Sequence, residues 1–238
     1  MIETVWLDNP PVNAVNGGII DTLWTAFENL DEAVNVVVLR GKGERAFSAG
    51  ADITGFVGGA AEGDRPAGIQ PVADLIEAAP VPVVAAIHGY CLGGGLEIAL
   101  ACDFRIATRD AQLGFPEVNL GLLPGGGGTQ RGPRLISRGR ATWLIMSGER
   151  IPAATAEAWG LVEFLVDDLE AGIERYVEPL DRQSPHALRQ IKSLLRDTRD
   201  ERDDEREVAA FAACLNSEDG REGVAAFLEK RQASWTGR

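Results

Sequence analysis

The stretch H-G-Y-C-L-G-G-G-L-E-I-A-L-A-C-D spans residues 88–103 and follows the apolar run V-P-V-V-A-A-I at 81–87. The run predicts a buried β-strand, and the residues from Leu92 to Ala101 predict a helix that begins at the glycine cluster. Glu97 would lie in the first turns of this helix, where unpaired N–H groups and the helix dipole favour negative charge. The same geometry would allow the Gly94 N–H to hold an oxyanion.

Outward from this stretch, short strands alternate with helices. Strands are expected at 4–7, 34–39, 104–107 and 162–166, and helices around 20–27 and 72–79. From Leu169 onward the pattern predicts helices alone. The glycine-rich stretch 57–68 is expected to be a mobile surface loop, and the charged stretch 196–207 a solvated helix face or turn. Together these elements indicate an α/β core over 1–167 with a helical region over 168–238.

A second carboxylate lies beside further glycines. Glu117 ends the sequence G-F-P-E (114–117), and P-G-G-G-G follows at 124–128. Taken alone, Glu97 reads as an ordinary first-turn helix glutamate and Glu117 as a loop carboxylate that caps nearby backbone. Taken together, a carboxylate pair can divide one proton delivery from one proton removal, while glycine turns bring backbone N–H groups close to an oxyanion.

Composition argues against several classes of function. The chain has 238 residues, 45% hydrophobic and 25% charged, with a net charge of −13 that disfavours nucleic acid and anionic membrane as partners. No apolar run is long enough for a membrane span, and the N-terminus lacks the pattern of a signal peptide, so a cytoplasmic location is expected. The cysteines and histidines show no metal-ligand spacing, which predicts reduced thiols and no metal site: Cys91, Cys102, Cys214, His88 and His186.

Other glycine-rich motifs and nucleophile motifs are absent or incomplete. No G-x-x-x-x-G-K-[ST] sequence is present, which excludes a P-loop at the level of the motif. G-x-G-x-x-A occurs at 41–46, but the residues after it do not predict the helix that a dinucleotide fingerprint requires. The nucleophile-elbow motif G-x-S-x-G is absent as well.

Three motifs resemble one known family when they are taken together. They are R-A-F-S-A-G-A-D-I at 45–53, the stretch at 88–103, and F-P-E-V-N-L-G-L-L-P-G-G-G-G-T-Q-R at 115–131. The chain resembles the enoyl-CoA hydratase/isomerase (crotonase) superfamily from about Val5 to Arg238, including a closing-helix sequence at 217–231. The resemblance implies a ClpP-like α/β spiral of ββα units. It also implies that the C-terminal helical region builds homotrimers, or hexamers as dimers of trimers.

The resemblance also assigns roles to the site residues. The backbone N–H groups of Ala51 and Gly94 would form an oxyanion hole for the thioester carbonyl, Glu97 would activate water for attack at C3, and Glu117 would protonate C2. Residues expected to bind coenzyme A are Ala49, Ala51, Asp52, Ile53, Phe227 and Lys230, the last two from a neighbouring subunit as one option. No cofactor or metal is implied, because the acyl-CoA thioester is itself the substrate. Thr54 departs from the lysine that many relatives carry after G-A-D-I, so the phosphate contacts are open, with Lys42, Arg45 and Lys230 as candidates.

Retention of both glutamates favours one reaction over the others. The expected activity is that of an enoyl-CoA hydratase, reversible hydration of trans-2-enoyl-CoA to 3-hydroxyacyl-CoA in fatty-acid or related acyl-CoA degradation. Family members that only shift a double bond usually keep the carboxylate that matches Glu117, so a Δ3-Δ2-enoyl-CoA isomerase is the second reading. A non-catalytic acyl-CoA-binding homologue is the third, because a fold by itself does not guarantee turnover.

Overall fold

The computed structural model describes residues 1–52, 68–197, 211, 213–214 and 216–238, except for the side chains of residues 197 and 227. Ile53, Thr54 and nearly all of the predicted surface loop at 57–68 lie outside the described residues. Most of the charged stretch at 196–207 does as well.

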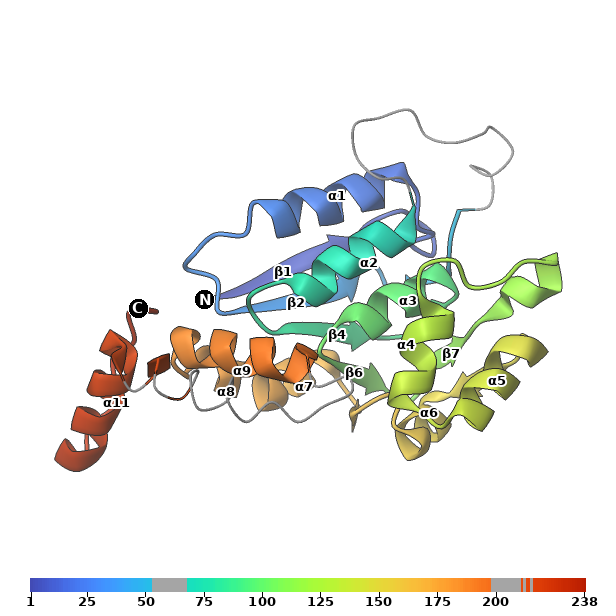
Figure 1. Ribbon diagram of the computed structural model, residues 1–238. Helices are drawn as coiled ribbons and strands as arrows, with labels where there is room; N and C mark the ends of the chain where they lie inside the picture. Colours follow the sequence, from blue (N-terminus) through green and yellow to red (C-terminus); the bar gives the residue numbers. More distant parts are fainter. Residues whose placement is uncertain (53–67, 198–210, 212, 215) are drawn as a thin grey trace.

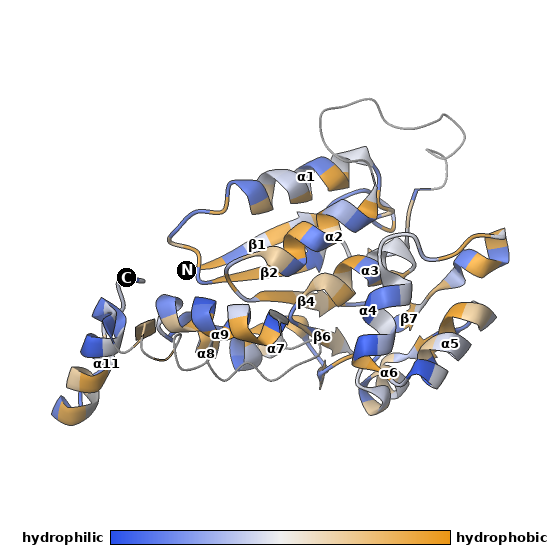
Figure 2. Cartoon of the chain, in the orientation of Figure 1, coloured by the Kyte–Doolittle hydropathy of each residue, from blue (hydrophilic) through white to orange (hydrophobic). Residues whose placement is uncertain are grey.

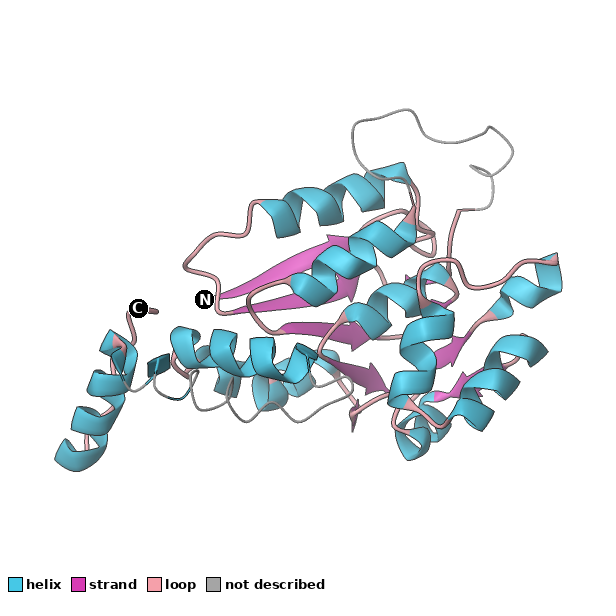
Figure 3. Cartoon of the chain, in the orientation of Figure 1, coloured by secondary structure: helices cyan, strands magenta, loops and turns pink. Residues whose placement is uncertain are grey.

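A five-stranded sheet forms the centre of the molecule (Figure 3). Its order is β1 (Ile2–Leu7), β2 (Val36–Gly41), β4 (Val83–Ile87), β6 (Phe104–Thr108) and β9 (Phe164–Val166), and every pairing is parallel. Each strand overlaps one expected from the apolar pattern. Parallel strands need long crossovers, and helices supply most of these connections.

Both faces of this sheet are covered at its inner strands, which explains why β4 is wholly apolar and β2 nearly so. Val37 and Leu39 of β2 belong to the larger core, with α1 (Gly17–Glu28), α2 (Ile69–Ala78) and α3 (Gly94–Ala101). Their neighbours Val36 and Val38 point to the opposite face and pack with residues of α7 (Leu169–Tyr176) and with Val177, which precedes α8 (Glu178–Asp181). Figure 1 shows the two helix layers, and Figure 2 shows the hydrophobic strands between them.

A second, smaller sheet was not predicted. It consists of β3 (Ala46–Ser48), β5 (Tyr90–Leu92), β7 (Gln112–Gly114) and β8 (Arg150–Pro152), each only three residues long. Leu92 therefore ends a strand, and the helix expected from that residue begins two residues later. Three-residue strands are too short to show a detectable alternation in sequence. Their pairing is also decided by residues that are distant in the chain.

The remaining helices extend from this two-sheet body. After the 3-10 helix η2 (Pro116–Leu120) come α4 (Gly128–Leu135), α5 (Arg138–Ser147) and α6 (Ala153–Trp159). The chain then passes through α7 and α8 to α9 (Pro185–Asp197) and α11 (Glu218–Glu229). α7 lies beyond residue 167 but packs on the large sheet. The expected division of the chain into a core and a helical region at that residue stays a prediction.

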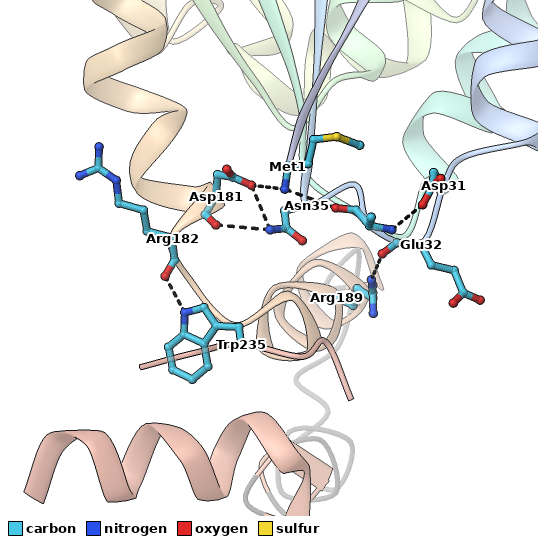
Figure 4. A network of polar contacts seen from close by, with 9 residues as sticks. Met1, Asp31, Glu32, Asn35, Asp181, Arg182, Arg189 and Trp235 are labelled. Carbon is cyan, nitrogen blue, oxygen red and sulfur yellow. Dashed lines mark hydrogen bonds and ion pairs between the residues drawn. The ribbon is translucent and has the colours of Figure 1, made fainter. Parts of the chain in front are cut away.

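Polar contacts join the C-terminal segments to the edge of the large sheet (Figure 4). The N-terminal amine of Met1 donates to Asp181 Oδ1 at 2.6 Å, and Asn35 Nδ2 donates to the same oxygen at 2.9 Å. Trp235 Nε1 donates to the Arg182 carbonyl at 2.6 Å. These bonds hold the last residues of the chain near its beginning.

None of the helices in the described parts of the chain is long and apolar enough to cross a bilayer. Within the same parts, no three His, Cys, Asp or Glu side chains are grouped so that they could hold a metal ion. Cys91 and Cys102 are buried thiols, and burial raises the pKa of both.

Candidate active site

Glycines allow α3 to begin deep inside the protein. All eight residues of α3 are buried, and Gly93 before it has φ +49°, a left-handed conformation that glycine adopts without strain. A Cβ on Gly93 would lie 2.9 Å from Glu117 Oε1, and a Cβ on Gly95 would lie 2.5 Å from the Ser48 Cβ. Side chains at these positions would separate the helix start from the groups around it.

Glu97, in the first turn of α3, is anchored by the glycine turn at 126–128. Its side chain is 2% exposed, and Oε1 accepts hydrogen bonds from the Gly126 N–H at 2.7 Å and the Gly128 N–H at 2.8 Å. Burial raises the pKa of Glu97, while the two N–H groups and the positive charge of Arg131 oppose the rise. Both anchoring bonds end on Oε1. The other oxygen, Oε2, accepts no hydrogen bond from a described residue.

Glu117 lies in the first turn of η2, directly after Pro116. Its Oε2 is buried without a hydrogen-bond partner among the described residues. Burial raises the pKa of Glu117 to about 7, with a further contribution from the negative charge of Glu97 and an opposing one from its own backbone N–H. A large fraction of this carboxyl therefore carries its proton near neutral pH.

The segments that carry the backbone N–H groups of Ala51 and Gly94 lie side by side. A Cβ on Gly94 would lie 3.4 Å from the Ala51 nitrogen, so the two segments are in contact. Neither N–H donates a hydrogen bond to another described residue. The Ala51 segment is held by Val15, whose N–H donates to the Gly50 carbonyl at 2.7 Å and whose carbonyl accepts from the Asp52 N–H at 2.8 Å.

Three buried polar residues that support this geometry were missed in the sequence. Ser48 Oγ donates to the Asn13 carbonyl at 2.7 Å and accepts from the Gly50 N–H at 3.3 Å. Asn13, at φ +54°, donates through Nδ2 to the Ala46 carbonyl at 2.8 Å. Arg131 was assigned no role of its own from the sequence. Its position three residues after a glycine run is the signal that could have indicated a contact with that turn.

An apolar residue, Ile69, was also missed. It begins α2, and its side chain lies between two of the glycines: a Cβ on Gly94 would come within 2.2 Å of Ile69 Cδ1, and a Cβ on Gly126 within 2.6 Å of its Cγ2. Ile69 thus packs beside both the Gly94 N–H and the turn that anchors Glu97. Nothing in the sequence indicated this position, because Ile69 is distant from both glycines along the chain.

The residues expected to bind coenzyme A are not all brought together within one chain. Ala49, Ala51 and Asp52 are partly exposed and follow β3. Phe227 lies in α11 and Lys230 just after it; α11 packs against α9 and lies in Figure 1 at the far end of the molecule from α3. Lys42, a candidate phosphate contact, pairs with Asp8 at 2.7 Å.

The arrangement brings two carboxyl groups with different surroundings to the start of α3, where the Ala51 segment also lies. Glu97 is anchored through one oxygen by two N–H groups and lies near a cation, and these contacts oppose the rise that burial causes in its pKa. Glu117 has no such partner on Oε2, which favours its protonated form. Such a pair can remove one proton and deliver another while the N–H groups stabilise a developing oxyanion.

Comparison with known proteins gives consistent matches. The family model described as enoyl-CoA hydratase/isomerase matches residues 1–238. A probable enoyl-CoA hydratase of Bacillus subtilis is 38% identical over 99% of this chain and 95% of its own length. A crotonyl-CoA hydratase of Syntrophomonas wolfei is 40% identical over 87% of this chain and 82% of its own length. The crystal structure of an enoyl-CoA hydratase from Bacillus anthracis superposes with a TM-score of 0.91 at 35% identity, over 100% of this chain and 96% of that one. The crotonase-type α/β fold expected from the sequence is confirmed by this structural similarity.

Proposed function

The chain belongs to the enoyl-CoA hydratase/isomerase family of acyl-CoA enzymes, and we propose that it catalyses the reversible addition of water to a trans-2-enoyl-CoA. The product would be the 3-hydroxyacyl-CoA. One observation supports this activity above the others: an anchored Glu97 and a Glu117 of raised pKa both lie at the glycine start of α3, Glu97 in its first turn and Glu117 against Gly93. Hydration needs both a base for the water and an acid for C2, whereas moving a double bond needs only one group that shuttles a proton.

The proposed step moves two protons and forms one C–O bond. Oε2 of Glu97 takes a proton from a water molecule as the water oxygen bonds to C3 of the thioester. The electron pair of the C2–C3 double bond shifts toward the thioester carbonyl, and Glu117 delivers its proton to C2. Glu97 is then protonated and Glu117 ionised, and exchange with solvent restores both for the next turnover.

The N–H groups of Ala51 and Gly94 would hold the thioester oxygen while it carries negative charge. Removing one such donor from an enzyme typically raises the barrier by about 3–4 kcal/mol. Both groups belong to segments that are held in place, Ala51 beside the backbone bonds to Val15 and Gly94 at the start of a buried helix. A site that is rigid before substrate binds needs little reorganisation when charge develops.

We also propose that coenzyme A lies along the segment from Ala49 to Asp52 and that the active form is a homotrimer or a dimer of trimers. The distance between this segment and α11 in one chain supports contributions from Phe227 and Lys230 of a neighbouring copy. Exposed apolar side chains on α11, Val224 at 52% and Leu228 at 73%, support an interface there.

A second candidate reaction is Δ3-Δ2-enoyl-CoA isomerisation. It is favoured by the buried, unpartnered Oε2 of Glu117, because a carboxyl with a pKa of about 7 can both take up and return a proton near neutral pH. In this reaction Glu97 would not exchange a proton with the substrate. Replacement of Glu97 therefore separates the two reactions.

The test follows the loss of the conjugated-thioester absorbance of crotonyl-CoA and of a longer trans-2-enoyl-CoA. Wild type is compared with Glu97→Gln and Glu117→Gln, and with Glu157→Gln, an exposed glutamate of α6, as the matched control. We expect both site variants to lose activity by about 10²- to 10⁴-fold and the control to keep it. Full activity in Glu97→Gln would contradict the hydratase assignment.

Two further outcomes identify the alternatives. Conversion of a 3-enoyl-CoA that survives Glu97→Gln but not Glu117→Gln would identify an isomerase. Thermal stabilisation by acyl-CoA without any turnover would identify a binding protein, because a ligand that binds only the folded state raises the melting temperature.

A further inference from the structure

Arg131 is a buried cation that is linked to Glu97 through the glycine turn at 126–128. It belongs to α4 and is 6% exposed. Its Nη2 donates to Asp74 Oδ1 at 2.5 Å and to Glu77 Oε2 at 2.8 Å, both on α2, and its Nε donates to Glu77 Oε2 at 3.1 Å. The guanidinium is therefore fixed in orientation by two carboxylates of a neighbouring helix.

The remaining arm of this guanidinium reaches the turn that anchors Glu97. Nη1 donates to the Gly126 carbonyl at 3.1 Å, and the Gly126 N–H donates to Glu97 Oε1 at 2.7 Å. Gly127 has φ +103°, and a Cβ there would lie 2.1 Å from Nη1, so the guanidinium packs directly against its backbone. The Arg131 N–H also donates to the Gly127 carbonyl at 2.8 Å.

We propose that Arg131 is a positioning residue that fixes the glycine turn at 126–128, so that the Gly126 and Gly128 N–H groups hold Glu97 with Oε2 directed at the attacking water. The proposal rests on the hydratase function proposed above. Its physical basis is that the turn itself contains only glycines, which have the greatest backbone freedom of all residues. The side-chain contacts of Arg131 supply the rigidity that the sequence of the turn lacks.

Arg131 also acts on Glu97 through its charge. Arg131 from α4 lowers the pKa of Glu97, and Glu117 from η2 is the acidic group on the substrate side. Asp74 and Glu77 from α2 lie behind the guanidinium and partly offset its charge. Loss of Arg131 would both loosen the turn and leave three acidic groups, Glu97 and these two, without their shared cation.

Substitutions can separate positioning from charge. Arg131→Lys keeps the positive charge but loses the fork that contacts α2 and the turn, and Arg131→Met loses both the charge and the fork. Arg134→Met removes an exposed arginine from the same helix and is the matched control. We expect kcat for hydration to fall about 10- to 100-fold in Arg131→Lys, with KM changed by less than about 3-fold, because a displaced catalytic group lowers turnover more than binding. Arg134→Met should match wild type.

A second readout does not depend on turnover. The amide proton shifts of Gly126 and Gly128, followed by NMR through a pH titration, report both their hydrogen bonds and the ionisation of Glu97, with Glu97→Gln to assign the transition. In Arg131→Met we expect smaller downfield shifts and a transition at higher pH than in wild type. In Arg131→Lys we expect the same loss of downfield shift at the two amide protons, but a smaller rise in the transition pH than in Arg131→Met, because the positive charge is kept.

The outcomes distinguish this proposal from the proposed function. Wild-type kcat in Arg131→Lys, or unchanged amide shifts in both variants with the fold intact by circular dichroism, would overturn the positioning role. If wild type hydrates no enoyl-CoA while the amide shifts change as expected, the hydratase function fails and the contact between Arg131 and the Glu97 anchor stands. Should Arg131→Met fail to fold, Arg131→Lys decides by itself.

Discussion

An alanine at position 126 would place a methyl group against the anchored carboxylate. Its Cβ would lie 2.6 Å from Glu97 Oε2 and 2.6 Å from Ile69 Cγ2. Glu97 Oε2 would have to retreat by about 0.4 Å to reach 3.0 Å and by about 0.8 Å to reach an ordinary contact of 3.4 Å. Gly126 does not have the positive φ that would strain an alanine, so this displacement is the main effect.

A shift of this size is large for a catalytic group. Misplacement by ~1 Å can cost ~100-fold in rate, so we expect kcat of Gly126→Ala to fall about 10- to 100-fold. The free energy of unfolding should fall by only about 1–3 kcal/mol, as in other overpacked sites, because Glu97 and Ile69 are side chains that can move.

The assay is hydration of a trans-2-enoyl-CoA under saturating substrate, with thermal unfolding measured on the same samples. Gly125→Ala is the matched control: Gly125 is the exposed neighbour in the same turn, and its Cβ would meet nothing within 4 Å. We expect this control to keep wild-type kcat. A folded Gly126→Ala that turns over as fast as Gly125→Ala would refute the argument that the turn fixes Glu97 for catalysis.

Three other substitutions test separate parts of the structure. Because the folded state raises the pKa of Glu117 from 4.5 to about 7, it binds a proton that the unfolded state releases, and wild-type stability falls as pH rises through that window. Glu117→Gln should therefore match wild type in Tm at pH 4 and exceed it at pH 8, by about 1–2 kcal/mol in unfolding free energy once solvent screening of this partly exposed carboxyl is allowed for; an equal difference at both pH values would contradict the raised pKa. Gly94→Ala, whose Cβ would lie 2.2 Å from Ile69 Cδ1, should lower turnover, and Ile69→Ala in the same chain should restore part of it; additive effects would argue against this contact. Lys192→Met removes the ion pair between the buried Lys192 and the exposed Asp103, together with a hydrogen bond from Lys192 to the Val81 carbonyl, and should lower the unfolding free energy by about 1–3 kcal/mol while leaving kcat unchanged below Tm; an unchanged Tm would mean that these contacts do not hold α9 to the core.

Apolar runs made the inner strands β2 and β4 of the large sheet predictable. The run at 81–87 contains β4, and the glycines after it indicated a helix start with Glu97 in its first turn, as found for α3. Both inferences depend only on residues close together in the chain. The roles of Glu97 and Glu117 stay predictions, since the structure establishes their geometry and the surrounding charges but no reaction.

The sequence by itself determined which segments are strands with two buried faces, where the glycine turns lie and which carboxylates stand beside them, because periodicity and backbone freedom are local properties. Only the tertiary structure decided which groups meet: that Gly126 and Gly128 bind Glu97, that Arg131 of α4 links this turn to α2, and that Ile69 packs between two glycines. Apart from the short link between Arg131 and the adjacent turn, these contacts join residues about 25 to 57 positions apart. The tertiary structure also decided how Glu97 and Glu117 differ. Burial and neighbouring N–H groups set the pKa of each carboxyl group, and the residue type alone specifies neither its burial nor its neighbours.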